Sequence, residues 1–210
     1  MLRGMASGMA SSVVSVSESW ERVESWLAAW APVTHAALAP PAARSDVAAA
    51  AEEAIGMEFP DPLRESLLRH DGTGYRVLPP PFWMLLDTAR MVETWRSRTR
   101  INERSASFSP DEAEEVDAEA DFGPWWHRRW IPFAADGGGD CLVIDQRPST
   151  WRGRVGKADH EQGCFFPRHA MWASLPALLH WTATALETGD VVDGYEPFVT
   201  AEGELDWDIP

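Results

Sequence analysis

Residues 130–145 read WIPFAADGGGDCLVID, and this stretch decides the class of fold. The run from Trp130 to Phe133 is typical of a strand, and Cys141 to Ile144 is typical of a second, buried strand. Between them, Asp136 to Asp140 holds three consecutive glycines, which suits a tight turn. The stretch therefore predicts two antiparallel strands joined by a short loop.

More strands are expected after this hairpin. Gly153 to Lys157 and Cys164 to Phe166 are short runs of the right composition. A helix capped by Ser174 then places leucines on one face and ends at Gly189. The second half of the chain is thus a meander of strands followed by one helix.

The first half is helical in pattern. The first predicted helix has apolar residues that share one face at helical spacing, namely Trp20, Val23, Leu27 and Trp30. Ser17 or Ser19 is expected to cap it. An alanine-rich helix follows from Ser45, its expected cap, and Gly56 closes it in a left-handed conformation.

Two more helices are expected before the hairpin. Asp61 and Pro62 form an N-cap and N1 pair, and Asp87 can cap a longer helix. The prolines at 79–81 restrict residues 75–86 to an edge strand or an extended loop. Helices, then strands, then a helix predict an α+β fold: a single domain with an antiparallel or mixed sheet flanked by helices.

Charge is concentrated in two segments of this acidic chain, whose net charge is −15. Residues 105–123 and residues 190–210 each hold seven acidic side chains and no basic one, and the remainder is nearly neutral. A nucleic-acid partner is excluded, because no basic stripe is present to bind phosphates. The charge suits a cationic protein partner, but a charge run is also common as a solvated face.

The candidate partner-binding residues lie in and beside these segments. They are Asp111, Glu112, Glu114, Glu115, Asp117, Trp125, Trp126, Asp206 and Asp208. The run Ser109 to Glu112 matches a capping box, so a short exposed helix is expected there. Trp125 and Trp126 suit interface anchors and equally suit core residues. The tail, residues 190–210, can form a small hairpin around Gly203.

Residues 1–17 are expected to form a flexible leader, because Gly and Ser interrupt any signal-peptide core. No run approaches the ~20 apolar residues that cross a bilayer, so no membrane association is expected. Cys141 and Cys164 are the two cysteines and have no C-x-x-C spacing. We therefore expect no disulfide framework. We expect a reducing, cytoplasmic location.

The order of these segments resembles the SUKH superfamily, which includes the fungal cell-wall assembly regulator and many bacterial toxin-immunity proteins. The places that carry the resemblance are residues 20–27, 54–68, 130–145 and 174–189. The family-like positions within them are Trp20, Gly56, Trp130, Pro132, Asp136, Gly138, Asp140 and Asp145. The resemblance implies a SUKH-like domain over residues 18–189 with structural roles for these positions and no catalytic residues.

Two groups of residues have the right side chains to bind a metal, but neither has the spacing of a metal-binding motif. Asp136, Asp140 and Asp145 offer oxygen ligands, but an EF-hand pattern is absent and a glycine turn explains the loop. Cys141, Cys164, His160 and His169 are the right residue types for zinc without paired short spacings. No metal and no cofactor are expected. A G-x-S-x-G elbow and a phosphate-binding loop are also absent.

The sequence predicts a non-catalytic protein-binding domain, an immunity protein that neutralises a cognate toxin by direct binding. A cationic toxin domain is the expected partner. The alternative is a cellular regulatory or scaffold protein that binds a partner other than a toxin. An enzyme is a third reading, which rests only on the loose Asp and Cys/His groupings.

Overall fold

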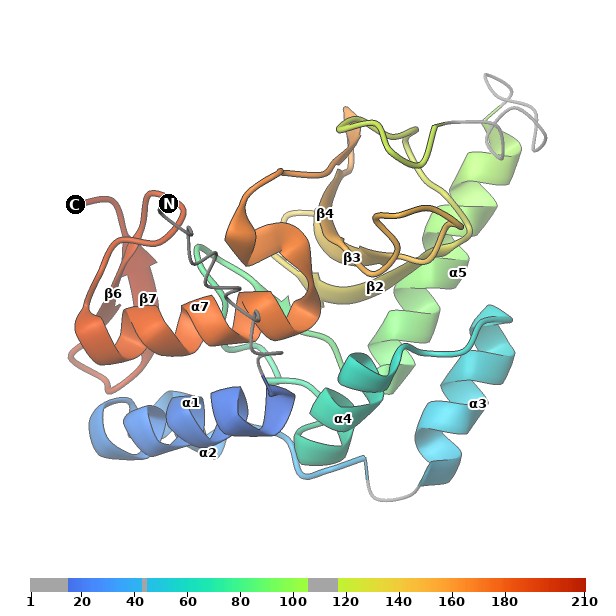
Figure 1. The fold of residues 1–210 in the computed structure, drawn as a ribbon. Helices are drawn as coiled ribbons and strands as arrows, with labels where there is room; N and C mark the ends of the chain where they lie inside the picture. Colours follow the sequence, from blue (N-terminus) through green and yellow to red (C-terminus); the bar gives the residue numbers. More distant parts are fainter. Residues whose placement is uncertain (1–14, 43–44, 106–116) are drawn as a thin grey trace, which may run out of the picture.

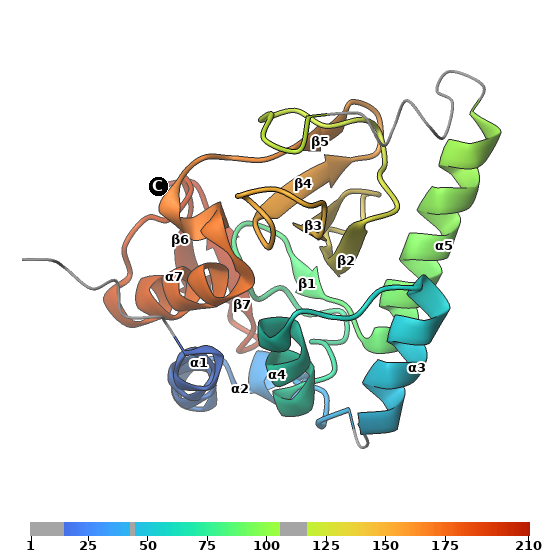
Figure 2. The same ribbon diagram turned by 45° about the vertical axis from the view of Figure 1, so that its right-hand side comes forward.

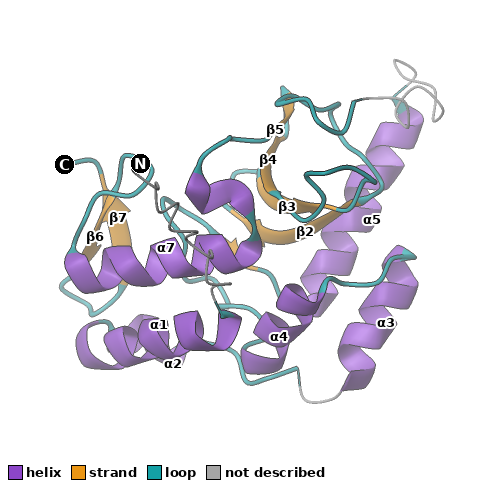
Figure 3. Cartoon of the chain, in the orientation of Figure 1, coloured by secondary structure: helices purple, strands orange, loops and turns teal. Residues whose placement is uncertain are grey.

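The computed structural model describes residues 15–42, 45–105 and 117–210. Helices flank a sheet, as predicted for an α+β fold (Figures 1 and 3). In chain order the helical elements are α1 (Val16–Trp30), α2 (Pro32–Ala36), α3 (Ser45–Ile55), α4 (Asp61–Arg69), α5 (Thr88–Arg104), the 3-10 helix η1 (Ala170–Ala173) and α7 (Leu175–Thr188).

The strands form two antiparallel sheets. The five-stranded sheet has the order β1-β2-β3-β4-β5, so each strand lies beside its neighbour in sequence (Figure 2). Its strands are β1 (Met84–Leu85), β2 (Trp130–Ala135), β3 (Cys141–Asp145), β4 (Val155–Asp159) and β5 (Gly163–Phe165). A separate pair consists of β6 (Glu196–Val199) and β7 (Leu205–Asp208).

The hairpin predicted over residues 130–145 is confirmed, and it forms the centre of the larger sheet. Trp130 pairs with Asp145 and Ala135 with Cys141, with an irregularity between Pro132 and Ala134. β1 pairs only with the last two residues of β2 and is an edge strand, as the prolines before it predict. The hairpin thus sets the register of the sheet.

Both faces of β3 are buried, because successive side chains of a strand point to opposite faces. Leu142 and Ile144 join the larger core, which α1, α4 and α7 also line. Cys141 and Val143 join a smaller, aromatic core on the other face. The smaller core contains Trp126, Trp130, Cys141, Val143, Ala158, Cys164 and Phe166. Residues 117–129 must therefore fold over the face of the sheet that the helices leave uncovered.

The helix caps were predicted with mixed success. Asp87 accepts a hydrogen bond from the Arg90 amide (2.7 Å), and Ser174 accepts one from the Ala177 amide, as expected. Gly189 ends α7 with a φ of 73°, in the left-handed region that favours glycine.

Other helix-start predictions were wrong. Ser15, rather than Ser17 or Ser19, caps α1, since its hydroxyl accepts from the Glu18 amide (3.2 Å). Asp61 is the first residue of α4 and not its cap. Trp30 was also expected on the buried apolar face of α1, but it is 64 % exposed.

The acidic tail forms the predicted small hairpin, and the hairpin is part of the main core. Leu205 and Trp207 are buried there, and the Trp207 indole N–H donates to the Leu78 carbonyl (3.1 Å). The Leu205 amide donates to the Thr34 hydroxyl (2.8 Å). The tail is therefore tied both to α2 and to the loop before β1.

Some expectations fall outside the described residues. They are the leader up to residue 14, a side-chain cap at Ser45, the capping box at Ser109 and the candidate acids Asp111, Glu112, Glu114 and Glu115.

Candidate protein-binding site

A buried ionic network lies at the end of β3. Asp145 is fully buried and its carboxylate accepts from Arg147 at 2.7 and 2.9 Å and from Arg154 at 3.3 Å. Both arginines are themselves buried. Burial lowers the pKa of Arg154, against the opposing effect of Asp145. Because breaking a buried ion pair leaves an uncompensated charge, this network fixes the position of Arg154 firmly.

Arg154 in turn holds the end of the acidic segment. Its Nη2 donates to the Ala118 carbonyl (2.8 Å) and to the Ala120 carbonyl (3.0 Å). The chain then runs beside β5, where the Phe166 amide donates to the Asp121 carbonyl (2.7 Å). An isolated bridge joins Phe122 to Phe165. The residues after the acidic insert therefore extend the edge of the sheet.

Three exposed aromatic side chains lie along this edge. Phe122 is 72 % exposed, Phe165 41 % and Trp151 41 %. The rings of Phe122 and Phe165 are 5.0 Å apart, and Arg168 lies 5.5 Å from the Trp151 ring. Scattered exposed apolar residues are normal on proteins, but a ring pair on a sheet edge is a local apolar patch.

Acidic side chains frame this patch. Arg168 pairs with Asp121, and the Thr150 hydroxyl donates to the Glu119 carboxylate (3.0 Å). Asp117 and Glu119 are exposed. We refer to Asp117, Glu119, Asp121, Phe122, Trp151 and Phe165 together as the aromatic–acidic face. It combines a small apolar centre with the carboxylates of Asp117 and Glu119 and with Asp121, whose charge Arg168 balances.

The two tryptophans predicted as candidate anchors lie in different environments. Trp126 is fully buried in the smaller core, and its indole N–H donates to Thr99 (3.1 Å). Trp126 is therefore a core residue and not a surface anchor. Trp125 is half-buried and its indole N–H donates to the His160 carbonyl (2.8 Å). Trp125 therefore keeps one accessible side.

The candidate acids of the tail are on the other hairpin. Asp208 is exposed and Asp206 half-buried on β7. Each carboxylate accepts a hydrogen bond from the amide of the next residue (2.9 Å at Trp207 and 2.8 Å at Ile209). These two acids are not part of the aromatic–acidic face.

The three aspartates around the glycine turn do not converge. Asp136 Oδ1 accepts the amides of Gly138, Gly139 and Asp140 at 2.7, 3.1 and 3.0 Å. It closes the turn by itself. Asp145 is engaged in the buried network, so the set of oxygen ligands suggested by the sequence is not assembled.

Asp140 belongs to another cluster, with Asp159 and His160, whose ligand atoms lie within 4.8 Å of one another. Lys157 Nζ already lies 2.9 Å from Asp140 and 3.9 Å from Asp159, in the place that a cation would take. Although burial opposes the shift, hydrogen bonds from His160 and Lys157 lower the pKa of Asp140 to about 2. The carboxylate is thus satisfied by protein groups.

The cysteine and histidine grouping is not a site for zinc either. Burial raises the pKa of Cys141 to about 12 and that of Cys164 well above its ordinary value. Both thiols lie in the smaller core, whereas the rings of His160 and His169 are about half exposed. Buried thiols of this kind behave as small apolar residues.

The remaining family-like positions have structural surroundings. The Trp20 indole N–H donates to the Ser66 hydroxyl (3.0 Å) and joins α1 to α4. Gly56 ends α3 at a φ of 74°. Trp130 packs against Trp126, with ring centroids 5.9 Å apart. Pro132 lies at the irregularity in β2.

Sequence reasoning missed the aromatic side chains of the face and the arginine that positions it. Phe122 directly follows the acidic run and was a usable signal, because an aromatic beside a charged segment is a common interface composition. Arg154 gave no such signal. Its role depends on Ala118 and Ala120, which are distant from it in sequence.

The fold is an α+β domain, and one edge of its larger sheet carries the aromatic–acidic face. The chain belongs to the SMI1 / KNR4 family (SUKH-1), whose family model matches residues 41–179. This confirms the predicted resemblance. The family includes toxin-immunity proteins. A comparison with curated proteins gives no match. Within the described ranges, no helix is long and apolar enough to cross a membrane.

Proposed function

We propose that this chain is a non-catalytic protein-binding domain, an immunity protein that neutralises a cognate toxin by binding directly to it. Membership of a family that includes toxin-immunity proteins supports this function. The observation that carries it is the aromatic–acidic face, where Phe122 and Phe165 are exposed side by side next to the acidic segment.

The chemistry of the face favours a cationic partner, such as a basic toxin domain. Exposed aromatic rings supply anchors whose burial stabilises an interface, because aromatic side chains carry much of the binding energy in such contacts. The surrounding acids, with those of residues 111–115, attract positive charge and accelerate encounter. An apolar centre with a charged rim is the usual arrangement of a protein interface.

The experiment is affinity capture with the full chain from the cells that make it, followed by a growth assay. The captured protein is expressed alone and together with the chain. We expect it to stop growth when alone and to be harmless in the presence of the chain. If the captured partner is harmless by itself, the chain is a regulatory or scaffold protein and the immunity function is wrong.

The same assay locates the interface. Phe122→Ala combined with Phe165→Ala should weaken partner binding by about thirtyfold or more and abolish growth protection, since each ring is expected to contribute about 1–2 kcal/mol. Trp30→Ala is the matched control, because it also removes an exposed aromatic ring, on α1. Equal loss in both variants would indicate an effect other than removal of the interface.

A further inference from the structure

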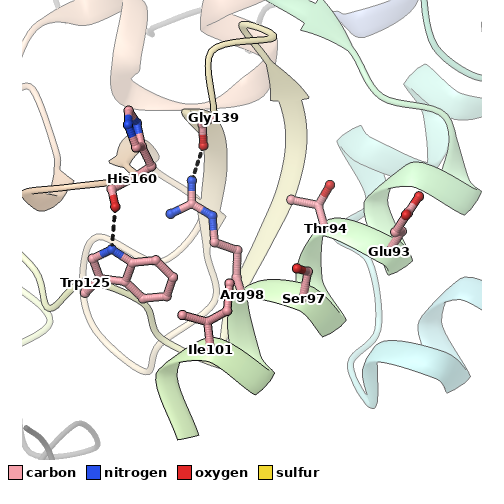
Figure 4. A pocket seen from close by; sticks show the side chains of 8 residues that line it. All are labelled: Glu93, Thr94, Ser97, Arg98, Ile101, Trp125, Gly139 and His160. Carbon is pink, nitrogen blue, oxygen red and sulfur yellow. Dashed lines mark hydrogen bonds between the residues drawn. The ribbon is translucent and has the colours of Figure 1, made fainter. Parts of the chain in front are cut away.

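A pocket lies on the side of α5 that faces the glycine turn (Figure 4). Its volume is about 470 Å³, which is in the range of small-molecule sites. Arg98 extends from α5 between Trp125 on one side and Thr94 and Ser97 on the other (Figure 4). The half-exposed side chain of Ile101 adds an apolar wall.

Arg98 is only 7 % exposed, although it carries a permanent positive charge. Its Nη2 donates to the Gly139 carbonyl and, at 3.5 Å, to the Ala158 carbonyl. Its guanidinium lies 5.0 Å from the Trp125 ring and 5.9 Å from the Trp126 ring. These contacts hold the group in place but do not neutralise its charge.

Arg98 is not paired with any carboxylate among the residues that the structure describes, and its Nη1 has no hydrogen-bond partner there. The other two buried arginines, Arg147 and Arg154, both contact the carboxylate of Asp145. Burial of an unpaired charge costs free energy, which carbonyl oxygens and π faces offset only in part. Arg98 therefore lacks the counter-ion that its environment favours.

Most of the other charged groups near the pocket pair with one another. His160 and Lys157 both contact the carboxylate of Asp140, so this group adds little net charge. Glu93 lines the pocket as a further negative group. Arg98 is thus the positive group of the pocket, and because Glu93 adds a negative charge nearby, an anion of charge −1 is favoured over a dianion.

We propose that this pocket binds a carboxylate group, which pairs with the Arg98 guanidinium while its carbon chain lies against Trp125 and Ile101. The hydroxyl groups of Thr94 and Ser97, on the opposite side of Arg98 from Trp125, are further hydrogen-bond donors in the pocket. Two sources carry this chemistry: an acidic side chain on a protein partner, or a small free carboxylate.

The test uses the full chain labelled with ¹⁵N and no partner protein, so its result is independent of the proposed immunity function. The probe is the indole N–H signal of Trp125, assigned by its loss in Trp125→Phe. N-acetylglutamate amide and butyrate, which each carry one negative charge, are titrated at constant ionic strength, with N-acetylglutamine amide and inorganic phosphate as comparisons. We expect saturable shifts with both carboxylates at Kd values on the order of millimolar.

The neutral glutamine derivative should bind at least about tenfold more weakly, because it lacks the charge-assisted hydrogen bonds to Arg98. Equal binding of this derivative, tighter binding of phosphate, or no saturable shift with either carboxylate would overturn the proposal. Tighter binding of N-acetylglutamate amide than of butyrate supports a partner side chain as the source, and the reverse order supports a small molecule.

Two sets of variants assign the binding to Arg98. Arg98→Gln should abolish the shift, and its folding is checked by the remaining indole signals. Because that variant also loses contacts to Gly139 and Ala158, Ile101→Glu provides a second test at a half-exposed position. The added carboxylate should weaken binding of both carboxylates about tenfold or more, whereas the matched control Ile101→Gln should not. Unchanged binding in Ile101→Glu would place the carboxylate elsewhere.

Discussion

The two acidic segments, residues 105–123 and 190–210, each hold seven acidic side chains and no basic one, yet they are attached to the body by different interactions. The first is held by polar contacts, since buried Arg154 donates to the carbonyls of Ala118 and Ala120. The second is held by apolar contacts, since Leu205 and Trp207 are buried in the larger core.

The acidic charge of a segment therefore does not determine how that segment is attached to the body. Phe122 and Phe165 form an exposed ring pair beside the first segment, whereas in the second segment the large side chains of β7 are buried and Phe198 on β6 is 40 % exposed. Acids of both segments have partners in the body: Arg168 pairs with Asp121 of the first, and in the second Arg76 lies 2.5 Å from Glu204 and His169 3.3 Å from Asp193. The first segment is therefore the better candidate for contact with a partner, and the second is a part of the fold that carries charge.

The largest expected effect is on stability and comes from the apolar anchor of the tail. Trp207→Ala should lower the free energy of unfolding by about 4 kcal/mol, because it removes a buried ring and leaves the Leu78 carbonyl without its donor. Urea unfolding measures this loss. Ile209→Ala, at a 69 % exposed position of the same segment, should change stability by less than about 0.5 kcal/mol. A small loss in Trp207→Ala would mean that the tail is not part of the cooperative core.

The polar anchor should be nearly as important. Asp145→Asn should lower the free energy of unfolding by about 3 kcal/mol, because it leaves Arg147 and Arg154 buried without their counter-ion. Hydrogen exchange should show faster opening at the Gly123 amide, which donates to Cys164, and no selective change at β6 and β7. Equal loosening of both segments would contradict the separate attachments inferred here.

Features of the fold that depend on local sequence were predictable. The turn between β2 and β3 follows from three glycines and the Asp136 carboxylate, which accepts the amides of the last two glycines and of Asp140. The caps at Asp87 and Ser174 act within three residues. The cap of α1 was placed wrongly, because Ser15, Ser17 and Ser19 all precede the same apolar face and spacing alone does not choose among them.

Features that depend on distant contacts were not predictable from the sequence. Trp125 and Trp126 are neighbours of the same type, but one is half-buried and the other fully buried. Arg98 lies in a row of exposed arginines on α5 and is buried only because the glycine turn and residues 125–126 cover it. Counting acidic residues identified the two charged segments, but it did not identify the residues that hold these segments in place.

A smaller effect is expected when the charge of the first segment is reversed. Asp111, Glu112, Glu114 and Glu115 changed together to Lys should slow association with the captured partner by about ten- to a hundredfold at low salt, with little change in dissociation. Stopped-flow or surface-based kinetics at several salt concentrations measures this. The same four positions changed to Gln should give an intermediate rate. A wild-type association rate in the Lys variant would show that these acids are a solvated coat.

The smallest effect is expected from the same change in the tail. Asp206→Lys with Asp208→Lys reverses two charges on β7, and its matched partner is Asp117→Lys with Glu119→Lys on the aromatic–acidic face. The tail pair should change the association rate by less than about threefold at physiological salt, because the Debye length there is only ~8 Å. β6 and β7 lie beside one end of α7, away from α5 and the larger sheet (Figure 1).

The pair at Asp117 and Glu119 should slow association about tenfold, since these acids adjoin the proposed anchors. The fold should survive both changes, because neither pair forms an ion pair within the described ranges. If the tail pair slows association as much as the other pair, the partner contacts the hairpin as well, and the distinction between a binding segment and a folded, charged tail fails.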